Sequence, residues 1–138
     1  MKMRIKDLTG SSTPLPEGVY EVSVKEVKQT EYNSGSSGFT LQLKVESEEH
    51  NGRVIFDNLV VWNDDGTLSG AAFRWANFIV ACLGDDVEAE MSDMDAVTDI
   101  TEATTGKHLA VEVTVEPEDK NSGYKARNRI KNFMPLVA

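Results

Sequence analysis

The sequence predicts an all-β protein with one or two helices. Five antiparallel strands are expected to form an OB-fold-like barrel, with a helix between strands three and four. Five stretches alternate apolar and polar residues, the two-residue period that places one side of a strand in a core. One stretch between the third and fourth of them repeats its apolar residues at helical spacing instead. Another small barrel, or a β-sandwich with one helix, is the alternative topology.

Three strands joined by short loops make up the first half of the chain. The predicted strands cover residues 19–28, 39–46 and 53–62. A loop at 33–38 joins the first two, and the Asn51-Gly52 pair is typical of a tight hairpin turn. The third strand ends in a run of apolar residues, so we expect both of its faces to be buried there. We also place Phe56 in the core.

Residues 69–83 carry apolar side chains at helical spacing, and Gly84 is expected to end this helix. Cys82 lies on the apolar face and is expected in the core. As the one cysteine of the chain, it excludes an internal disulfide and is typical of a reducing compartment. The next segment, 85–105, holds eight acidic and no basic residues, and we interpret it as an acidic insertion. Ser92, with Asp95 three positions later, predicts a capped short helix within it.

The last two strands follow the acidic insertion. Gly106 opens the fourth strand, in which Leu109, Val111 and Val113 face inward. The loop 118–123 leads into the fifth strand, 124–133. The whole chain, 1–138, is expected to be one domain, and the turn-rich residues 1–16 are expected to dock on it as an irregular N-terminal arm.

The chain is acidic overall. It has 23 acidic and 14 basic residues and a formal net charge of −9, which argues against bulk attraction to nucleic acid or membrane. It has no apolar run of the roughly 20 residues that cross a bilayer, and its first residues lack the apolar core of a secretory signal. We therefore expect a cytoplasmic protein with no membrane contact. A local binding site remains compatible with this charge, because fields at a surface depend on how the charge is distributed.

The fifth strand departs from the acidic trend. It carries a basic residue at every second position, and we call these four residues the basic ladder: Lys125, Arg127, Arg129 and Lys131. The period of a strand gathers their side chains on one face. Guanidinium groups pair with phosphate oxygens in a planar fork, so the ladder favours a phosphate-bearing partner. The alternative is a solvated face whose charges protect a sheet edge.

Ligands of OB-folds lie across strands two and three, between the loops that follow strands one and four. Both loops here contain Asn-Ser-Gly and have a tyrosine nearby, so Tyr32 and Tyr124 are candidates for stacking on bases. The other candidate binding residues are Lys120, Lys44, Arg53 and Trp62. Phe133 shares the parity of the ladder, so it either stacks on a base or closes the end of the barrel.

Signals for catalysis are weak. His50 and His108 have no cysteine or acidic partner at metal-ligand spacing, and the chain has no phosphate-binding glycine loop and no nucleophile elbow. Pairs such as Asp64-Asp65 are typical of caps or solubilising surface. We therefore expect no enzyme activity, no metal and no cofactor. A metal-dependent nuclease is the catalytic alternative.

Several short motifs resemble a known family. They are Pro16-Glu-Gly-Val-Tyr-Glu-Val22, Asn51-Gly-Arg-Val-Ile-Phe-Asp-Asn-Leu59, Leu83-Gly84, Gly106-Lys-His-Leu-Ala-Val-Glu-Val113 and Arg127-Asn-Arg-Ile-Lys-Asn-Phe-Met-Pro135. In this order they resemble a family of small phage and prophage proteins labelled domain of unknown function 669. Its members resemble single-stranded DNA-binding proteins found near phage recombination and replication genes. The segment most similar to the family pattern is Asn128-x-Ile130-x-x-Phe133.

The resemblance implies an OB-fold protein that coats single-stranded DNA during phage replication or recombination. Its place would be the cytoplasm of an infected or lysogenic bacterial host, with other phage replication or recombination proteins as partners. We expect sequence-tolerant binding, in which the basic ladder neutralises phosphates and the tyrosines stack on bases. The sequence does not distinguish DNA from RNA. The alternative function is a protein-interaction or assembly barrel with no nucleic-acid binding, whose ladder meets the acidic segment of a neighbouring copy.

Overall fold

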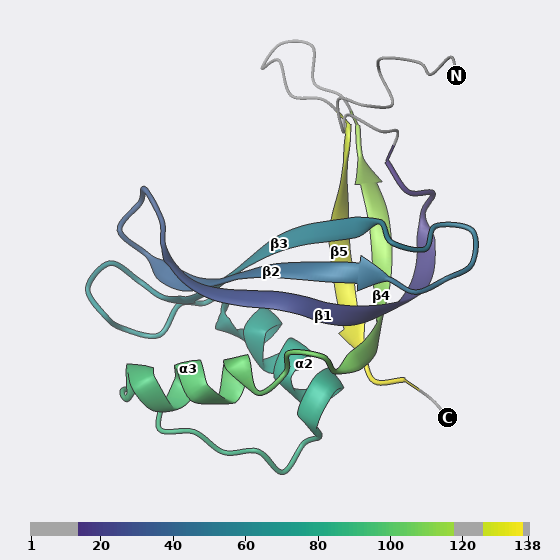
Figure 1. Ribbon diagram of the computed structural model, residues 1–138. Coiled ribbons are helices and arrows are strands. Elements are labelled where there is room, and N and C mark those ends of the chain that lie inside the picture. Colours follow the sequence, from purple (N-terminus) through teal and green to yellow (C-terminus); the bar gives the residue numbers. More distant parts are fainter. Residues whose placement is uncertain (1–13, 118–125, 137–138) are drawn as a thin grey trace, which may run out of the picture.

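The computed structural model describes residues 14–117 and 126–136 (Figure 1). These residues form β1 (Gly18–Glu31), β2 (Ser37–Val45), β3 (Val54–Trp62), α2 (Ala72–Leu83), α3 (Met94–Glu102), β4 (His108–Glu116) and β5 (Arg127–Met134). The strands make one antiparallel sheet in the order β3-β2-β1-β4-β5. The predicted fold class, mostly β with the main helix between the third and fourth strands, is confirmed.

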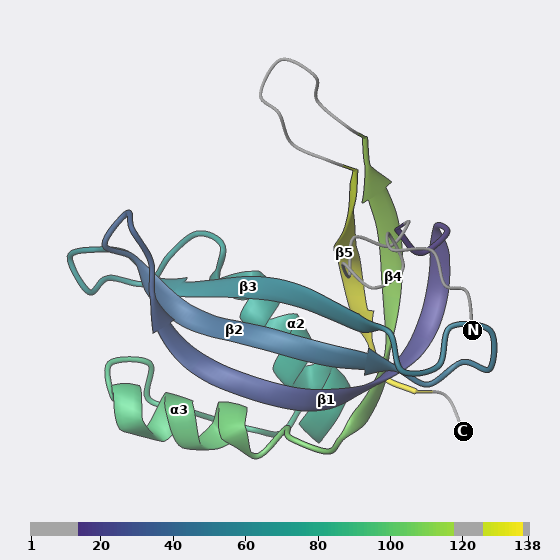
Figure 2. The same cartoon turned by 45° about the horizontal axis from the view of Figure 1, so that its top comes forward.

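The sheet is not closed, because β3 and β5 are its two edges and do not pair with each other in the described residues. Figures 1 and 2 show that the paired strands β4 and β5 run across the direction of the layer formed by β1, β2 and β3. The sheet curls so that its two edges, β3 and β5, contact each other, and α2 packs against both of them as well as against β4. We call the unpaired region between β3 and β5 the seam.

β1 holds the two parts of the sheet together. Its residues 18–23 pair with β4, and its residues 22–31 pair with β2. The register with β2 shifts between Val24 and Glu26, which leaves Lys25 as an extra residue. A bulge of this kind bends a strand and increases its twist. Because of this bend, β1 can pair both with β2, in the β1–β2–β3 layer, and with β4, which runs across that layer.

The core lies between the sheet and the two helices. α3 packs beneath β1, as both views show. The buried Trp75 of α2 donates its indole N–H to Thr101 Oγ1 of α3 over 2.9 Å, which joins the helices. Half-burial raises the pKa of the Cys82 thiol to about 12. No helix among the described residues is long and apolar enough to cross a membrane.

Two helix starts differ from the prediction. α2 begins at Ala72 rather than at residue 69, because the N–H of Ala72 already bonds Ser69 O in a preceding turn. The N-cap of α3 is Asp93, one residue after the predicted Ser92, and its carboxylate accepts a hydrogen bond from the N–H of Ala96. Ser92 instead donates to the side chain of Glu90. Asp93 lies three residues before the N–H that it caps, which is the spacing such caps require.

A bulge near the end of β3 turns Trp62 into the core. Ser37 pairs with Trp62 but Gly38 pairs with Val60, so Val61 is an extra residue. Trp62 is 4% exposed and donates its indole N–H to Met91 O over 3.0 Å. In this position its ring faces are covered, and we remove Trp62 from the candidate stacking residues.

A second bulge determines the position of Phe133. Val113 pairs with Ile130 and Glu112 with Asn132, which leaves Lys131 as the extra residue of β5. Phe133 therefore leaves the face of the basic ladder and is buried, with its ring at 5.4 Å from that of Phe78. Of the two roles left open for it, packing in the core is the one observed.

The described end of the N-terminal arm, residues 14–16, is fixed to β5. Leu15 is buried, and its N–H donates to Asn128 Oδ1 over 2.8 Å. Asn128 Nδ2 donates back to Leu15 O over 2.9 Å. Ile130 and Phe133 are also buried. The family-like pattern Asn128-x-Ile130-x-x-Phe133 is thus structural, and Arg129 and Lys131 occupy positions between its members.

Gly38 is required for the contact between β2 and β3. A Cβ placed on it would lie 1.9 Å from Leu59 O, in the backbone of the neighbouring strand. We expect Gly38→Ala to lower the free energy of unfolding by about 3 kcal/mol, the upper end of the usual cost of overpacking. Urea unfolding measures this. Gly70→Ala is the control, because the space around Gly70 is open, and equal stabilities of the two variants would contradict the prediction.

Candidate functional site

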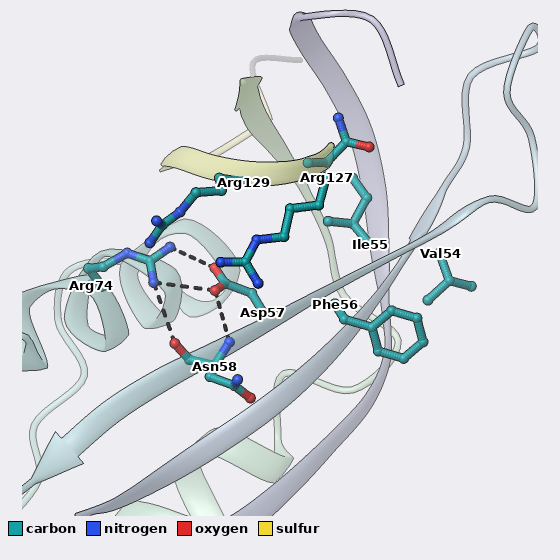
Figure 3. Close-up of a pocket in the computed structure, with 9 residues that line it drawn as sticks. Val54, Ile55, Phe56, Asp57, Asn58, Arg74, Arg127 and Arg129 are labelled. Carbon is teal, nitrogen blue, oxygen red and sulfur yellow. Dashed lines mark hydrogen bonds and ion pairs between the residues drawn. The ribbon is translucent and has the colours of Figure 1, made fainter. Parts of the chain in front are cut away.

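A cleft of about 470 Å³ opens at the seam between β3 and β5. One wall is residues 54–58 of β3, the other is residues 127–129 of β5, and Arg74 of α2 lies between them. Figure 3 shows the side chains of Arg127 and Arg129 extending from β5 towards β3, on the side where Arg74 and Asp57 meet. The cleft therefore combines three arginines from two elements with the residues of a sheet edge.

Arg74 connects the two edges of the sheet. Its Nη2 lies 2.6 Å from Asp57 Oδ2 of β3 and 3.1 Å from Ile130 O of β5. Its guanidinium carbon also lies 5.6 Å from the centre of the Phe133 ring, within cation–π range. The Arg74 and Asp57 side chains are 27% and 17% exposed. The seam has no backbone hydrogen bonds between β3 and β5 in the described residues. The hydrogen bonds of the Arg74 guanidinium link the two strands instead.

Our sequence reasoning missed this pair, although the sequence contains a signal for it. Ile55, Asp57 and Leu59 share one parity of β3, so Asp57 is the acidic exception on an inward-facing row. Arg74 lies beside the buried face of α2 and is the one charged residue of this helix. An isolated acid and an isolated base in two apolar elements are best explained as partners of each other, since a buried charge needs a counter-charge.

Phe56 lies on the outer wall of the cleft, which corrects our assignment of it to the core. It is 64% exposed, whereas its neighbour Ile55 is 4% exposed. Phe56 shares its parity with Asn58, and both point away from the core. A polar residue such as Asn58 indicates the outer face of a strand. Phe56 lies two positions before Asn58 on the same face, so the sequence could have predicted that Phe56 is exposed. Figure 3 shows its ring pointing away from the three arginines, and an exposed aromatic ring of this kind is suited to stacking on a planar ligand.

The described part of the basic ladder is Arg127, Arg129 and Lys131, and all three side chains are about 60% exposed. Acids on β4 accompany them. Glu116 Oε2 lies 3.1 Å from Arg127 Nε and 3.4 Å from Arg129 Nη1. Glu112 Oε2 lies 3.9 Å from Lys131 Nζ. The row of like charges expected from the sequence is therefore part of a mixed-charge surface across β4 and β5.

These exposed ion pairs are weak, at roughly 0.2–1 kcal/mol each. A phosphate can compete for the arginines, because two of its oxygens can accept the two parallel N–H groups of a guanidinium, as the two oxygens of a carboxylate do. Three predicted residues of this region, Lys120, Tyr124 and Lys125, lie outside the described residues.

The remaining candidates lie at different distances from the cleft. Lys44 of β2 pairs with Val54, which lines the cleft, and Arg53 directly precedes Val54. Both are half-buried and border the cleft at the start of β3. Tyr32 follows the end of β1, is half-buried, and has a buried hydroxyl oxygen. Burial raises the pKa of Tyr32 above its usual value. It offers less exposed aromatic surface than Phe56.

The loop after β1 does not border the arginine cleft. Its Gly35, with Ser37 of β2, instead lines a second cavity of about 630 Å³, together with Glu31, Asp64 and the residues that lead into α3. The residues lining this cavity include no lysine or arginine. Glu31 and Asp64 make this cavity acidic, and an acidic cavity repels phosphate.

The described residues contain no group of three or more His, Cys, Asp or Glu side chains placed to hold a metal ion. His108 is paired rather than isolated, since its Nδ1 lies 3.1 Å from Glu21 Oε2 across the β1–β4 ladder. His50 packs its ring edge-on against Tyr20, with centroids 5.9 Å apart. Contacts of this kind, with one carboxylate and with one aromatic ring, are typical of histidines on the surface of a sheet.

Comparison with protein families places the chain in one of them. A family model described as "Protein of unknown function (DUF669)" matches residues 4–138, so the chain belongs to this family. No protein of curated function matches the chain. The predicted family is confirmed over nearly the full length. The association with phages and with single-stranded DNA stays a prediction.

Proposed function

We propose that this DUF669 protein binds single-stranded nucleic acid without sequence preference, with single-stranded DNA as its main ligand. The observation that carries the proposal is the cleft at the seam, which Arg127 and Arg129 line from β5 and the exposed Phe56 lines from β3. Single-strand binding needs this combination, because cations hold the phosphates while an aromatic ring stacks on a base. The family resemblance suggests phage replication or recombination in the host cytoplasm as the setting.

The arginines and the phenylalanine have separate roles in this proposal. Arg127 and Arg129 pair with consecutive phosphates and exchange their contacts with Glu116 for contacts with the ligand. Phe56 stacks on a base and contributes roughly 1–3 kcal/mol whatever the base is. Arg74 stays with Asp57, since it already donates to both edges of the sheet. A duplex is a poor ligand, because its base faces are covered by their neighbours.

The fold supports the same location. The antiparallel order with a helix between the third and fourth strands agrees with the OB-fold-like arrangement expected from the sequence. Ligands of OB-folds lie on strands two and three. The outer face of these strands here carries Gln42, Thr40 and Asn58 next to Phe56, and Thr40 Oγ1 donates to Asn58 Oδ1 over 3.0 Å. These side chains support the proposal, because hydroxyl and amide groups can form hydrogen bonds with the edges of unstacked bases.

Fluorescence anisotropy with a labelled oligothymidine at several salt concentrations tests the proposal. We expect binding at low salt, with log affinity falling against log salt at a slope of about −2 for three phosphate contacts and about −3 if Lys125 adds a fourth. A duplex of the same length is the control and is expected to bind more weakly. Absence of binding at low salt, or a preference for the duplex, would reject the proposal.

The second candidate function is a protein-interaction barrel, and the mixed charges of β4 and β5 favour it. Glu116 and Glu112 already accompany the described cations of the ladder, as on a solvated or protein-binding surface. If the ladder meets the acidic segment of a neighbouring copy, self-association weakens as salt increases. Sedimentation at two salt concentrations, in the absence of oligonucleotide, distinguishes this function from the first.

A further inference from the structure

The outer face of α2 is apolar and is distinct from the cleft. Phe73 is 63% exposed and Val80 is 43% exposed, and the exposed Ala76 lies between them on the same face. The exposed Asn77 completes the stripe, which follows the spacing of one helix face and contains no charged residue. The buried face of α2, which includes Trp75 and Phe78, points the other way. Folding of a single chain gives no reason for a phenylalanine at this position.

A groove of about 230 Å³ lies beside this stripe, between α2 and the segment that follows it. Ala76 and Val80 form its edge on the helix, and Val87, Ala89 and Met91 form the opposite edge. Trp75 and Ile79 also line it, so the lining contains no charged side chain. The groove is large enough for one aromatic side chain. The exposed Phe73 therefore lies one helical turn from a groove that is large enough for a phenylalanine side chain.

We propose that this face of α2 is the interface of a symmetric dimer, in which two α2 helices pack antiparallel and Phe73 of each copy enters the groove of the other. A two-fold axis between Ala76 and Asn77 places Phe73 opposite Val80 of the second copy, because both lie equally far along the helix from that axis. The small side chain of Ala76 at the crossing point allows the helices to approach closely. Such a contact is self-complementary, as two-fold interfaces require.

The charges at the ends of α2 also fit an antiparallel second copy. The N-cap is Ala71, whose side chain makes no capping hydrogen bond, and the first turn contains no acid. The C-terminus is followed by Asp85, Asp86 and Glu88, the opposite of what a helix dipole favours within one chain. An antiparallel neighbour brings these acids to the uncapped positive end of its partner's helix. A second copy thus supplies the aromatic side chain, the groove and the missing acids together.

The dimer is tested by sedimentation velocity on the full chain over a range of concentrations, without oligonucleotide. We expect reversible dimers that persist at 0.5 M NaCl, where the Debye length is roughly 4 Å and exposed charges are largely screened, because the contact is apolar. Phe73→Ser is expected to raise the dissociation constant of the dimer at least tenfold, about the cost of truncating one interface anchor. Phe56→Ser is the matched control, since Phe56 is 64% exposed but lies in the cleft. It is expected to leave the dimer unchanged and to weaken oligonucleotide binding.

A cross-linking experiment locates the axis. In a Cys82→Ala background, Asn77→Cys is expected to form a covalent dimer on mild oxidation, because a residue beside a two-fold axis meets its own copy. Ser34→Cys, exposed in the loop after β1, is the control and is expected to stay monomeric. A monomer at all concentrations, a Phe73→Ser dimer as stable as that of the unmodified chain, or cross-linking at residue 34 instead of residue 77 would overturn the proposal.

Discussion

Reversal of both arginine charges on β5, by Arg127→Glu and Arg129→Glu together, is expected to lower the affinity for single-stranded oligonucleotides about 100-fold. Each charge-assisted contact contributes roughly 1.5 kcal/mol, and tenfold in affinity corresponds to about 1.4 kcal/mol. The loss is expected to be the same for all base sequences, because phosphate contacts carry no sequence information. The salt slope is expected to become shallower by about 1.4, which is two phosphate contacts. Anisotropy titrations with two oligonucleotides of different composition measure all three quantities.

Folding is not expected to suffer, since both side chains are about 60% exposed. Lys28→Glu with Lys107→Glu is the matched control, because it makes the same change in net charge at two exposed positions away from the cleft. If the control loses as much affinity as the arginine variant, binding follows the total charge of the protein. In that case the cleft is not the site.

Glu116→Gln separates the two explanations of the basic ladder. The carboxylate lies within 3.4 Å of both arginines and competes with any phosphate. Its removal is expected to raise oligonucleotide affinity severalfold, because two exposed ion pairs of roughly 0.2–1 kcal/mol each no longer have to be broken. If the surface serves only to keep the sheet edge solvated, this variant changes stability slightly and binding not at all.

The strands were predictable because alternation is a local property of the sequence. Val22, Leu43 and Val111 are buried as their parity indicates, and each pairs with a residue on both neighbouring strands. The parity of Phe133 failed for a non-local reason. Phe133 follows a bulged residue, as Trp62 does on β3, and a bulge arises from how two strands meet. Alternation along the sequence therefore predicts correctly which residues face the core up to the first bulge. After the bulge, the residues of the two faces are exchanged.

The candidate site was predictable only in part. The basic ladder was visible as a pattern within one strand, and two of its arginines do line the cleft. Its carboxylate partners were not visible, because the pairing of Glu116 with Arg127 depends on the register of β4 and β5. The cleft itself depends on the open seam. Strand order alone does not reveal whether the two edges of a sheet meet through backbone hydrogen bonds or through a side chain such as Arg74.

Replacement of Arg74 by methionine is expected to lower the free energy of unfolding by about 2–3 kcal/mol. Loss of one partner from a fully buried ion pair costs about 3–5 kcal/mol, and the 27% and 17% exposure of Arg74 and Asp57 reduces this. The variant leaves the Asp57 carboxylate without its cation and Ile130 O without its donor at the seam. For a chain of this size the loss corresponds to a fall in melting temperature of roughly 10 °C. Urea and thermal unfolding followed by circular dichroism measure it.

A double-mutant cycle with Asp57→Leu determines whether the pair acts as a unit. Each single variant leaves a mostly buried charge unpaired, whereas Arg74→Met with Asp57→Leu removes both charges and fills the space with apolar atoms. We therefore expect the double variant to recover at least 1.5 kcal/mol of the summed losses, roughly the coupling found between contacting residues. Additive losses would mean that the two side chains contribute independently. The seam would then depend on the packing of α2 against β3 and β5, and the 2.6 Å contact between Arg74 and Asp57 would add little.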